Sequence, residues 1–211
     1  MRAGLALAAA CALSACAGHR VGAGLPAGSL PVPLVRQATP YSCGAAAMSS
    51  VLRYWKVFDG GERSLYERLQ TTEEDGTDPR SMVKVARELG LKAELAENLT
   101  VDDLRRHLAE GQTVILDVQA WADDDPTPGD YSDNWEDGHY VVLVGLDETK
   151  AYVMDPSIHG GYGWIPLDEL PGRWHDYEDR DGTLWRYHGL GVAVSGADRL
   201  RSAPAPLERV R

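Results

Sequence analysis

The sequence has few cysteines, little positive charge and no long apolar run. Its 211 residues include three cysteines and one phenylalanine. The apolar segment of residues 3–13 is far shorter than the roughly 20 apolar residues that a membrane-spanning helix needs. Lysine and arginine number 21 against 32 aspartate and glutamate, which gives a net charge of −11. This acidity argues against nucleic acid or anionic lipid headgroups as partners.

The first 16 residues have the order of a bacterial export signal. Arg2 precedes the apolar segment, and a run of small residues ends at Cys16. The string LSAC at residues 13–16 resembles the lipobox of bacterial lipoproteins. We therefore expect residues 1–15 to be a signal peptide and Cys16 to carry a lipid anchor; an ordinary secretory signal and an unprocessed N-terminus are the alternatives. Because Ala17 is not aspartate, the resemblance to Gram-negative sorting implies a cell-envelope protein on the outer membrane, facing the periplasm.

Cleavage of the signal and lipidation would leave Cys43 as the only unmodified thiol. One thiol forms no internal disulfide, and in an oxidising compartment it is a liability unless it does chemistry or pairs with another molecule. Cys43 lies at the start of a predicted helix, whose N-terminus favours an anion by about 0.3–1 kcal/mol. Because that is less than one pKa unit, a thiolate nucleophile also needs a histidine partner.

The order of patterns along the chain predicts one α+β domain over residues 34–196. Apolar spacing and capping residues mark a first helix that starts near residue 42 or 43, with its apolar stripe at 48–55, and further helices at 62–70, 78–90 and 100–110. β-Branched and aromatic runs then mark strands at 113–118, 139–146, 151–154, 163–165 and 191–194. We predict a helical lobe packed on an antiparallel sheet, with a cleft between them. Gly- and Pro-rich residues 16–33 are predicted to be a flexible tether, and residues 197–211 a disordered tail.

Among the six histidines, His139 is the best partner for Cys43. It opens the most apolar strand pattern, where a sheet would hold the imidazole rigidly at the rim of the cleft. His107 falls on a helix, where we expect it at the surface. The remaining histidines lie in the tether, in loops or at strand edges: His19, His159, His175 and His188.

A third group is needed to accept the second N–H of the imidazole. Asp155 ends the strand that pairs with the His139 strand, so antiparallel pairing places it beside His139. Asp147 lies at the turn end of that hairpin and is the poorer candidate, whereas Asp117 stays open. Gln37, six residues before the cysteine, is the candidate side-chain donor to an oxyanion, together with the backbone N–H of Cys43.

These residues carry a family resemblance. The strings RQATPYSCGAAAM, GHYVVLVG and VMDPS together resemble the bacteriocin-processing cysteine peptidases, which have a papain-like fold and cleave leader peptides after a double glycine. The resemblance spans about residues 35–194. It implies that Cys43, His139, Asp155 and Gln37 form the active site. The best-known members are cytosol-facing domains of ABC exporters, whereas this chain carries the pattern of an export signal and is more similar to stand-alone relatives. The resemblance therefore leaves open whether this protein cleaves after a double glycine.

We therefore predict a cysteine peptidase of the cell envelope that acts on a peptide or protein substrate, with no cofactor and no metal. An acyl-transferring enzyme with the same triad is one alternative. The other is a non-catalytic, peptide-binding lipoprotein that uses tryptophans, which otherwise serve core and loop packing: Trp121, Trp135, Trp164 and Trp174. The acidic segment 123–137 is predicted to be a solvated loop; a calcium site or a collar for basic peptides is the alternative.

Overall fold

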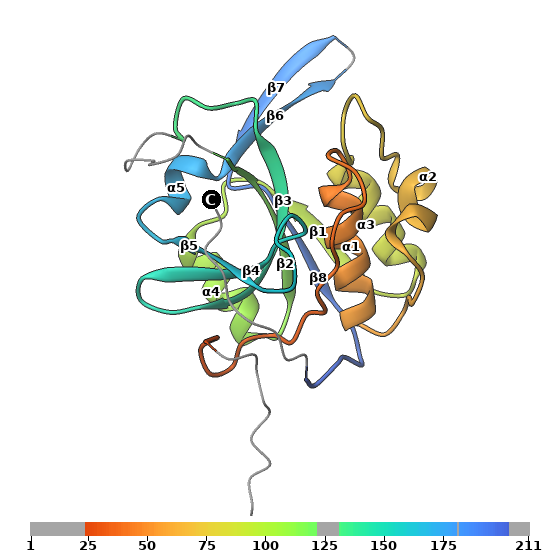
Figure 1. Ribbon diagram of the computed structural model, residues 1–211, viewed down its shortest axis with the longest axis vertical. Coiled ribbons are helices and arrows are strands. Elements are labelled where there is room, and N and C mark those ends of the chain that lie inside the picture. The colour runs from red at the N-terminus through yellow and green to blue at the C-terminus, as the bar shows by residue number, and fades with distance from the viewer. Residues whose placement is uncertain (1–23, 122–130, 181, 203–211) are drawn as a thin grey trace, which may run out of the picture.

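The computed structural model describes residues 24–121, 131–180 and 182–202, in which helices pack on both faces of an antiparallel sheet (Figure 1). The helices are α1 (Cys43–Tyr54), α2 (Tyr66–Leu69), α3 (Pro79–Glu88), α4 (Val101–Ala109) and α5 (Leu170–Arg173), with a 3-10 turn η1 (Glu62–Leu65). The strands are β1 (Lys92–Ala96), β2 (Thr113–Gln119), β3 (Gly138–Leu146), β4 (Lys150–Met154), β5 (Gly163–Pro166), β6 (His175–Arg180), β7 (Thr183–His188) and β8 (Gly191–Ser195).

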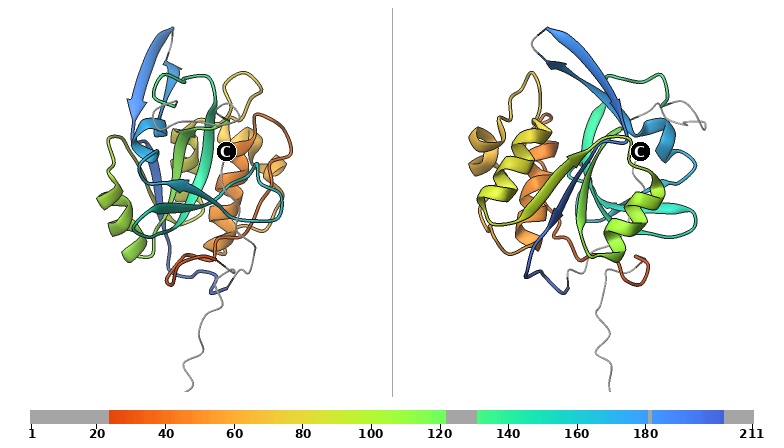
Figure 2. Two further views of the ribbon diagram at one scale, coloured as in Figure 1. Left: turned by 60° about the vertical axis from the view of Figure 1, so that its left-hand side comes forward. Right: turned by 180° about the vertical axis from the view of Figure 1, so that it is seen from behind.

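Six strands form the main sheet in the order β1-β8-β2-β3-β4-β5, and every pairing is antiparallel. The strands β6 and β7 form a separate hairpin that projects beyond the sheet (Figures 1 and 2). The central strands β2 and β3 are buried along most of their length because both faces are covered. The predicted α+β class is therefore confirmed.

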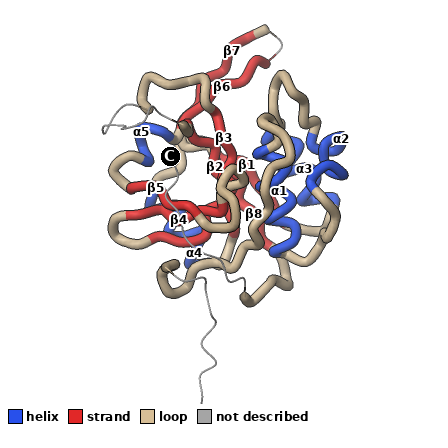
Figure 3. Tube along the Cα trace, viewed as in Figure 1, coloured by secondary structure: helices blue, strands red, loops and turns tan. Residues whose placement is uncertain are grey.

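The two faces of the sheet bury different side chains. The face toward α1 and α3 collects residues that include Met48, Leu52, Val142 and Val144. The opposite face packs against α4, with Leu104 fully buried on the other side of β2 and β3. Helices α1, α2 and α3 gather on one side, while α4 lies behind the sheet (Figures 2 and 3). The predicted helical lobe therefore consists of the first three helices.

Local signals account for the ends of the two best-marked helices. The side chain of Asp78 accepts hydrogen bonds from the N–H groups of Arg80 and Ser81, and Pro79 occupies the first helical position of α3. Thr100 and Asp103 form a reciprocal capping box at the start of α4. Both helices were predicted from these residues, within two residues of their observed bounds.

The predicted tether is too long at its C-terminal end. Leu30 and Val32 are buried in the core, and the N–H of Leu30 donates to the carbonyl of Val144 in β3 at 2.7 Å. These apolar side chains reach the sheet because the chain crosses its surface before α1. Residues 29–32 therefore belong to the folded body, whereas the predicted signal peptide and Cys16 lie outside the described residues.

The predicted disordered tail begins with an ordered segment. The N–H of Leu200 donates to the carbonyl of Tyr54 at 2.8 Å, and Nη1 of Arg199 donates to the carbonyl of Gly111 at 3.0 Å. These contacts bind Leu200 to the end of α1 and Arg199 to the turn that follows α4. Residues 203–211 and the stretch 122–130 of the acidic segment lie outside the described residues.

Candidate active site

Glu62 holds the loop that leads into α1. Its Oε1 accepts hydrogen bonds from the N–H of Ala38 at 2.7 Å and from the hydroxyl of Ser42 at 2.9 Å. The Ser42 hydroxyl also accepts from the N–H of Thr39 at 3.1 Å, so it makes no capping bond to α1. The first N–H groups of α1, beginning with that of Cys43, are therefore left for an anion. No motif marks Glu62 in the sequence, so its role in the loop was not predicted.

Gly44 allows α1 to approach the segment before α3. A Cβ at this position would lie 2.6 Å from the Cβ of Thr77 and 2.8 Å from the Cε of Met82. Such distances are far inside van der Waals contact, so any side chain would push the start of α1 away. The glycine that follows Cys43 thus fixes where the thiol lies, with Cys43 itself 9% exposed.

His139 and Asp155 meet through the antiparallel register of β3 and β4. Val142 pairs with Met154, which brings the end of β4 beside the start of β3. Nε2 of His139 lies 2.7 Å from Oδ1 of Asp155, and both side chains are almost completely buried. The hydroxyl and N–H of Ser157 donate to the same oxygen at 2.8 and 2.7 Å. These bonds hold the carboxylate toward Nε2 and leave Nδ1 as the ring nitrogen for a second partner.

The thiol of Cys43 lies close enough to the imidazole for each group to shift the pKa of the other. Nδ1 of His139 has no well-aligned hydrogen-bond partner in the described part of the chain, yet the thiol and the ring influence each other strongly. Catalytic contacts are often poorly aligned before substrate binds. The structure thus places Cys43 at the start of α1 near the hydrogen-bonded pair of His139 and Asp155 in the sheet.

The electrostatics of this group favour an ion pair. Burial alone would raise the pKa of Cys43, but the hydrogen bond and charge of His139, with the N–H groups of Tyr140 and Gly44, hold that pKa below its ordinary value. Burial would likewise lower the pKa of His139, but Asp155 and the thiolate raise it to about 10. The pKa of Asp155 is lowered, because its bonds to His139 and Ser157 outweigh burial. A thiolate and an imidazolium are therefore the favoured charge states near pH 7.

Gln37 lies next to the triad but is turned toward its own loop. Its backbone N–H donates to the carbonyl of Pro156, the residue after Asp155, at 3.0 Å. Its amide nitrogen donates to the carbonyls of Thr39 at 2.9 Å and Pro40 at 3.2 Å. Both amide protons are thus engaged, and one must be released before Gln37 donates to an oxyanion.

Trp121 is the candidate tryptophan that contacts the imidazole of the site. The ring of Trp121 lies 4.7 Å from that of His139, between centroids, and is 46% exposed. Trp135 contacts His175 and His188 instead, and the Nε1–H of Trp174 donates to the carbonyl of Leu190. Trp121 therefore shields one side of the imidazole from water, while Trp135 and Trp174 serve packing elsewhere.

The other candidate acids and histidines lie elsewhere or serve other contacts. The carboxylate of Asp147 binds the hairpin turn at Thr149 and Lys150, away from His139. Asp117 pairs with Tyr140 across β2 and β3, and its Oδ2 accepts a hydrogen bond from the hydroxyl of Tyr187. His107 is 6% exposed, not at the surface as expected, because α4 turns it toward Gln112.

No group of three or more His, Cys, Asp and Glu side chains within residues 24–121, 131–180 and 182–202 is arranged to hold a metal ion. In the same ranges no helix has the length and apolar character to cross a membrane.

Solved structures similar to this one are peptidase domains. The double-glycine-motif protease of an AMS/PCAT transporter, solved in complex with its leader peptide, aligns over 82% of this chain and 97% of its own length, with TM-score 0.55 and 21% identity. The peptidase domain of Streptococcus ComA, a bifunctional ABC transporter of a quorum-sensing pathway, aligns over 79% and 99%, with TM-score 0.52 and 17% identity. The fold is thus the papain-like fold of such domains, as the sequence predicted.

The sequence itself also matches a family. The model of the Peptidase_C39 like family covers residues 29–181. An uncharacterised protein of Methanothermobacter marburgensis is 30% identical over 126 residues, which are 59% of this chain and 72% of that protein. The chain belongs to the Peptidase_C39 like family.

Proposed function

We propose that the protein is a cysteine peptidase of the cell envelope, with Cys43 as nucleophile, His139 as general acid and base, and Asp155 as the group that orients His139. The observation that carries this proposal is the buried hydrogen bond between Oδ1 of Asp155 and Nε2 of His139, at 2.7 Å, in a ring whose pKa is raised by Asp155 and by Cys43. A histidine that served only to pack the core would not need to be protonated beside a buried sulfur.

The reaction follows from these positions. The Cys43 thiolate attacks the carbonyl carbon of a peptide bond, and negative charge moves to the carbonyl oxygen. The N–H of Cys43 donates to that oxyanion, and Gln37 supplies a second donor once it releases the carbonyl of Pro40. His139 then gives its Nδ1 proton to the leaving amine as the C–N bond breaks. Water next attacks the thioester, His139 takes a proton from it, and the acid product and thiolate are released.

The direct test compares the wild-type protein with Cys43→Ala on a peptide library, with cleavage sites read by mass spectrometry. We expect defined cleavage products from the wild type and none from the variant, because no other described side chain can replace the sulfur as nucleophile. Products that persist in Cys43→Ala would contradict the proposal. Adding a primary amine separates hydrolysis from acyl transfer, since a transferase yields the amide in place of the acid.

We further propose that Cys16 anchors the protein to the envelope membrane. The support is the LSAC string after a basic residue and an apolar run. In a lipoprotein-processing bacterium, the chain extracted from membranes should begin at residue 16. Its mass should exceed that of the unmodified mature chain by roughly 700–800 Da, for three acyl groups. An unmodified chain in the soluble fraction would rule this anchor out.

A further inference from the structure

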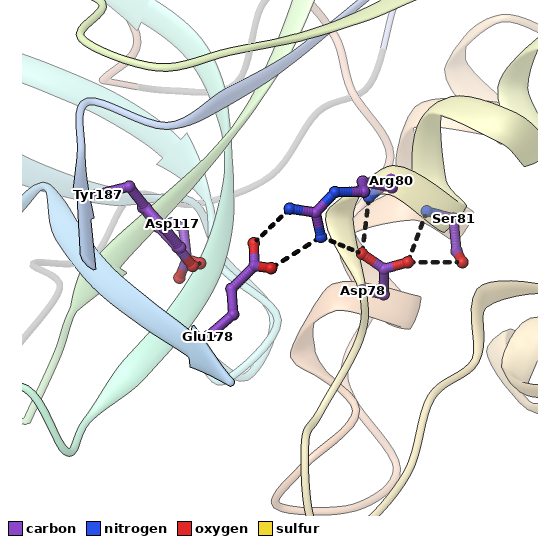
Figure 4. Close-up of polar contacts among 6 residues, drawn as sticks. All are labelled: Asp78, Arg80, Ser81, Asp117, Glu178 and Tyr187. Carbon is purple, nitrogen blue, oxygen red and sulfur yellow. Dashed lines mark hydrogen bonds and ion pairs between the residues drawn. The ribbon is translucent and has the colours of Figure 1, made fainter. Parts of the chain in front are cut away.

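The hairpin β6–β7 presents one face to the active site. Asp176 pairs with Tyr187 and Glu178 with Trp185, and directly opposed residues of an antiparallel pair share a face. The hydroxyl of Tyr187 donates to Oδ2 of Asp117 in β2 at 2.7 Å, so this face is turned toward the sheet. In Figure 4, Glu178 lies between that contact and helix α3.

Two carboxyl groups face each other at the inner end of this face. Asp117 is 2% exposed, and its Oδ1 receives no hydrogen bond from a donor among the described residues. Its neighbour Asp176 is an acceptor as well, so the two groups form a bond only when one of them holds a proton. Burial and the charge of Asp176 raise the pKa of Asp117, and burial raises the pKa of Asp176 to about 6. The pair therefore shares a proton near neutral pH.

Among the residues that the structure describes, no lysine or arginine forms an ion pair with Asp117 or Asp176, and the imidazolium of His139 pairs with Asp155 instead. The groups that face the two carboxyl groups from the packed elements are neutral or anionic: the thiol of Cys43 on α1, Gln119 on β2, Tyr140 on β3, Tyr187 on β7 and Glu178 on β6. Arg80 of α3 binds Glu178 on this face: its Nη1 lies 2.7 Å from Oε2 of Glu178 and 3.4 Å from Oδ1 of Asp78 (Figure 4). Arg80 thus binds at the outer end only.

An uncompensated negative charge beside the nucleophile is unfavourable for catalysis. The charges on Asp117 and the Cys43 thiolate repel each other, which raises the pKa of Asp117 and opposes ionisation of the sulfur. A positive charge placed between Asp117 and Glu178 would remove this repulsion. The bond from Arg80 to Glu178 shows that a guanidinium fits the outer part of the face.

We propose that Asp117, Asp176 and Glu178 form a recognition site for a basic side chain of the peptide substrate, a lysine or arginine close to the bond that Cys43 attacks. This proposal rests on the peptidase function proposed above. Asp176 is partly exposed and is the carboxyl group that the cation reaches first. Asp117 is buried and forms the inner end of the recognition site. Binding of the cation displaces the shared proton.

The test uses peptide pairs that differ by one side chain, lysine against norleucine or arginine against citrulline, at each position near the cleavage site. We expect the wild type to favour the basic member by about 10–100-fold in kcat/KM at one position, the range for hydrogen bonds to a charged group. Asp176→Asn and Glu178→Gln should each reduce that preference at least severalfold. The matched control is Asp179→Asn, which lies on the same strand but on the opposite face and should keep it.

The pH dependence gives a second readout. Because the cation displaces a proton from the pair, KM for the basic peptide should fall as pH rises through about 6, the pKa of Asp176, while KM for the neutral peptide should stay level there. Equal rates for both members at every position, or a preference that survives in Asp176→Asn, would overturn the recognition site. If the wild type cleaves no peptide, the peptidase proposal fails. The recognition site is then tested by measuring, with fluorescence, the affinity of the protein for each member of the same peptide pairs. Equal affinities for the basic and the neutral member would overturn the recognition site too.

Discussion

Replacing His139 by alanine should lower kcat for peptide cleavage by about 10²–10⁴-fold, the usual contribution of a general acid and base. The same change should shift the pH dependence of Cys43 alkylation. In the wild type, His139 holds the pKa of Cys43 below its ordinary value, so labelling should be rapid below pH 8. In the variant, His139 no longer opposes the effect of burial, so burial raises the pKa of the thiol above about 8.5. At pH 6–7, labelling should therefore slow by at least about tenfold.

The alkaline side of the wild-type profile tests the same ion pair. Because the pKa of His139 is raised to about 10, the imidazolium should persist, and peptide cleavage should decline only as pH approaches 10. His139→Gln keeps a polar side chain of similar size and serves as the second variant if the alanine variant folds poorly, with folding followed by circular dichroism. Labelling of either folded variant at the wild-type rate at pH 6–7 would show that His139 does not activate Cys43.

Local sequence signals were sufficient for the central elements of the site. Cys43 was predicted as the nucleophile because it would be the only unmodified thiol of the mature chain. The apolar run after His139 marked the strand that holds the imidazole. The hairpin argument placed Asp155 beside His139, because antiparallel pairing with a short turn leaves little freedom of register. The structure brings these three residues together. The catalytic role of the group stays a prediction.

The parts that sequence reasoning missed depend on contacts between distant segments. Glu62 organises the loop before Cys43 from 20 or more residues away, and no spacing rule connects them. The strands of the hairpin β6–β7 alternate charged and aromatic residues without a buried apolar face, so they gave no strand signal. Leu30 and Val32 were assigned to the tether because glycine and proline surround them, although tertiary packing buries both. Gln37 was placed correctly in the chain, but its rotamer depends on loop carbonyls that no motif encodes.

Removing the Asp155 carboxylate should have the largest effect on stability. His139 is fully buried, and its positive charge is balanced by Asp155 at 2.7 Å. Removing one member of a buried ion pair typically costs about 3–5 kcal/mol, because the other charge is left uncompensated. We therefore expect Asp155→Ala to lower the free energy of unfolding at pH 6–7 by about this amount. Denaturant titration followed by tryptophan fluorescence would measure the loss.

Asp155→Asn is the matched variant, since its amide oxygen still accepts a hydrogen bond from Nε2 of His139 while the charge is lost. Its cost should be smaller than that of alanine. The pH dependence separates charge from shape. The pKa of His139 is raised above its unfolded value near 6.5, so the stability from its protonation is complete below pH 6.5 and is lost as pH rises toward about 10. The difference between wild type and Asp155→Ala should therefore shrink over that interval. A difference that stays constant from pH 6 to pH 10 would mean that Asp155 stabilises the fold by packing and neutral hydrogen bonds alone, and that His139 carries no charge for it to orient.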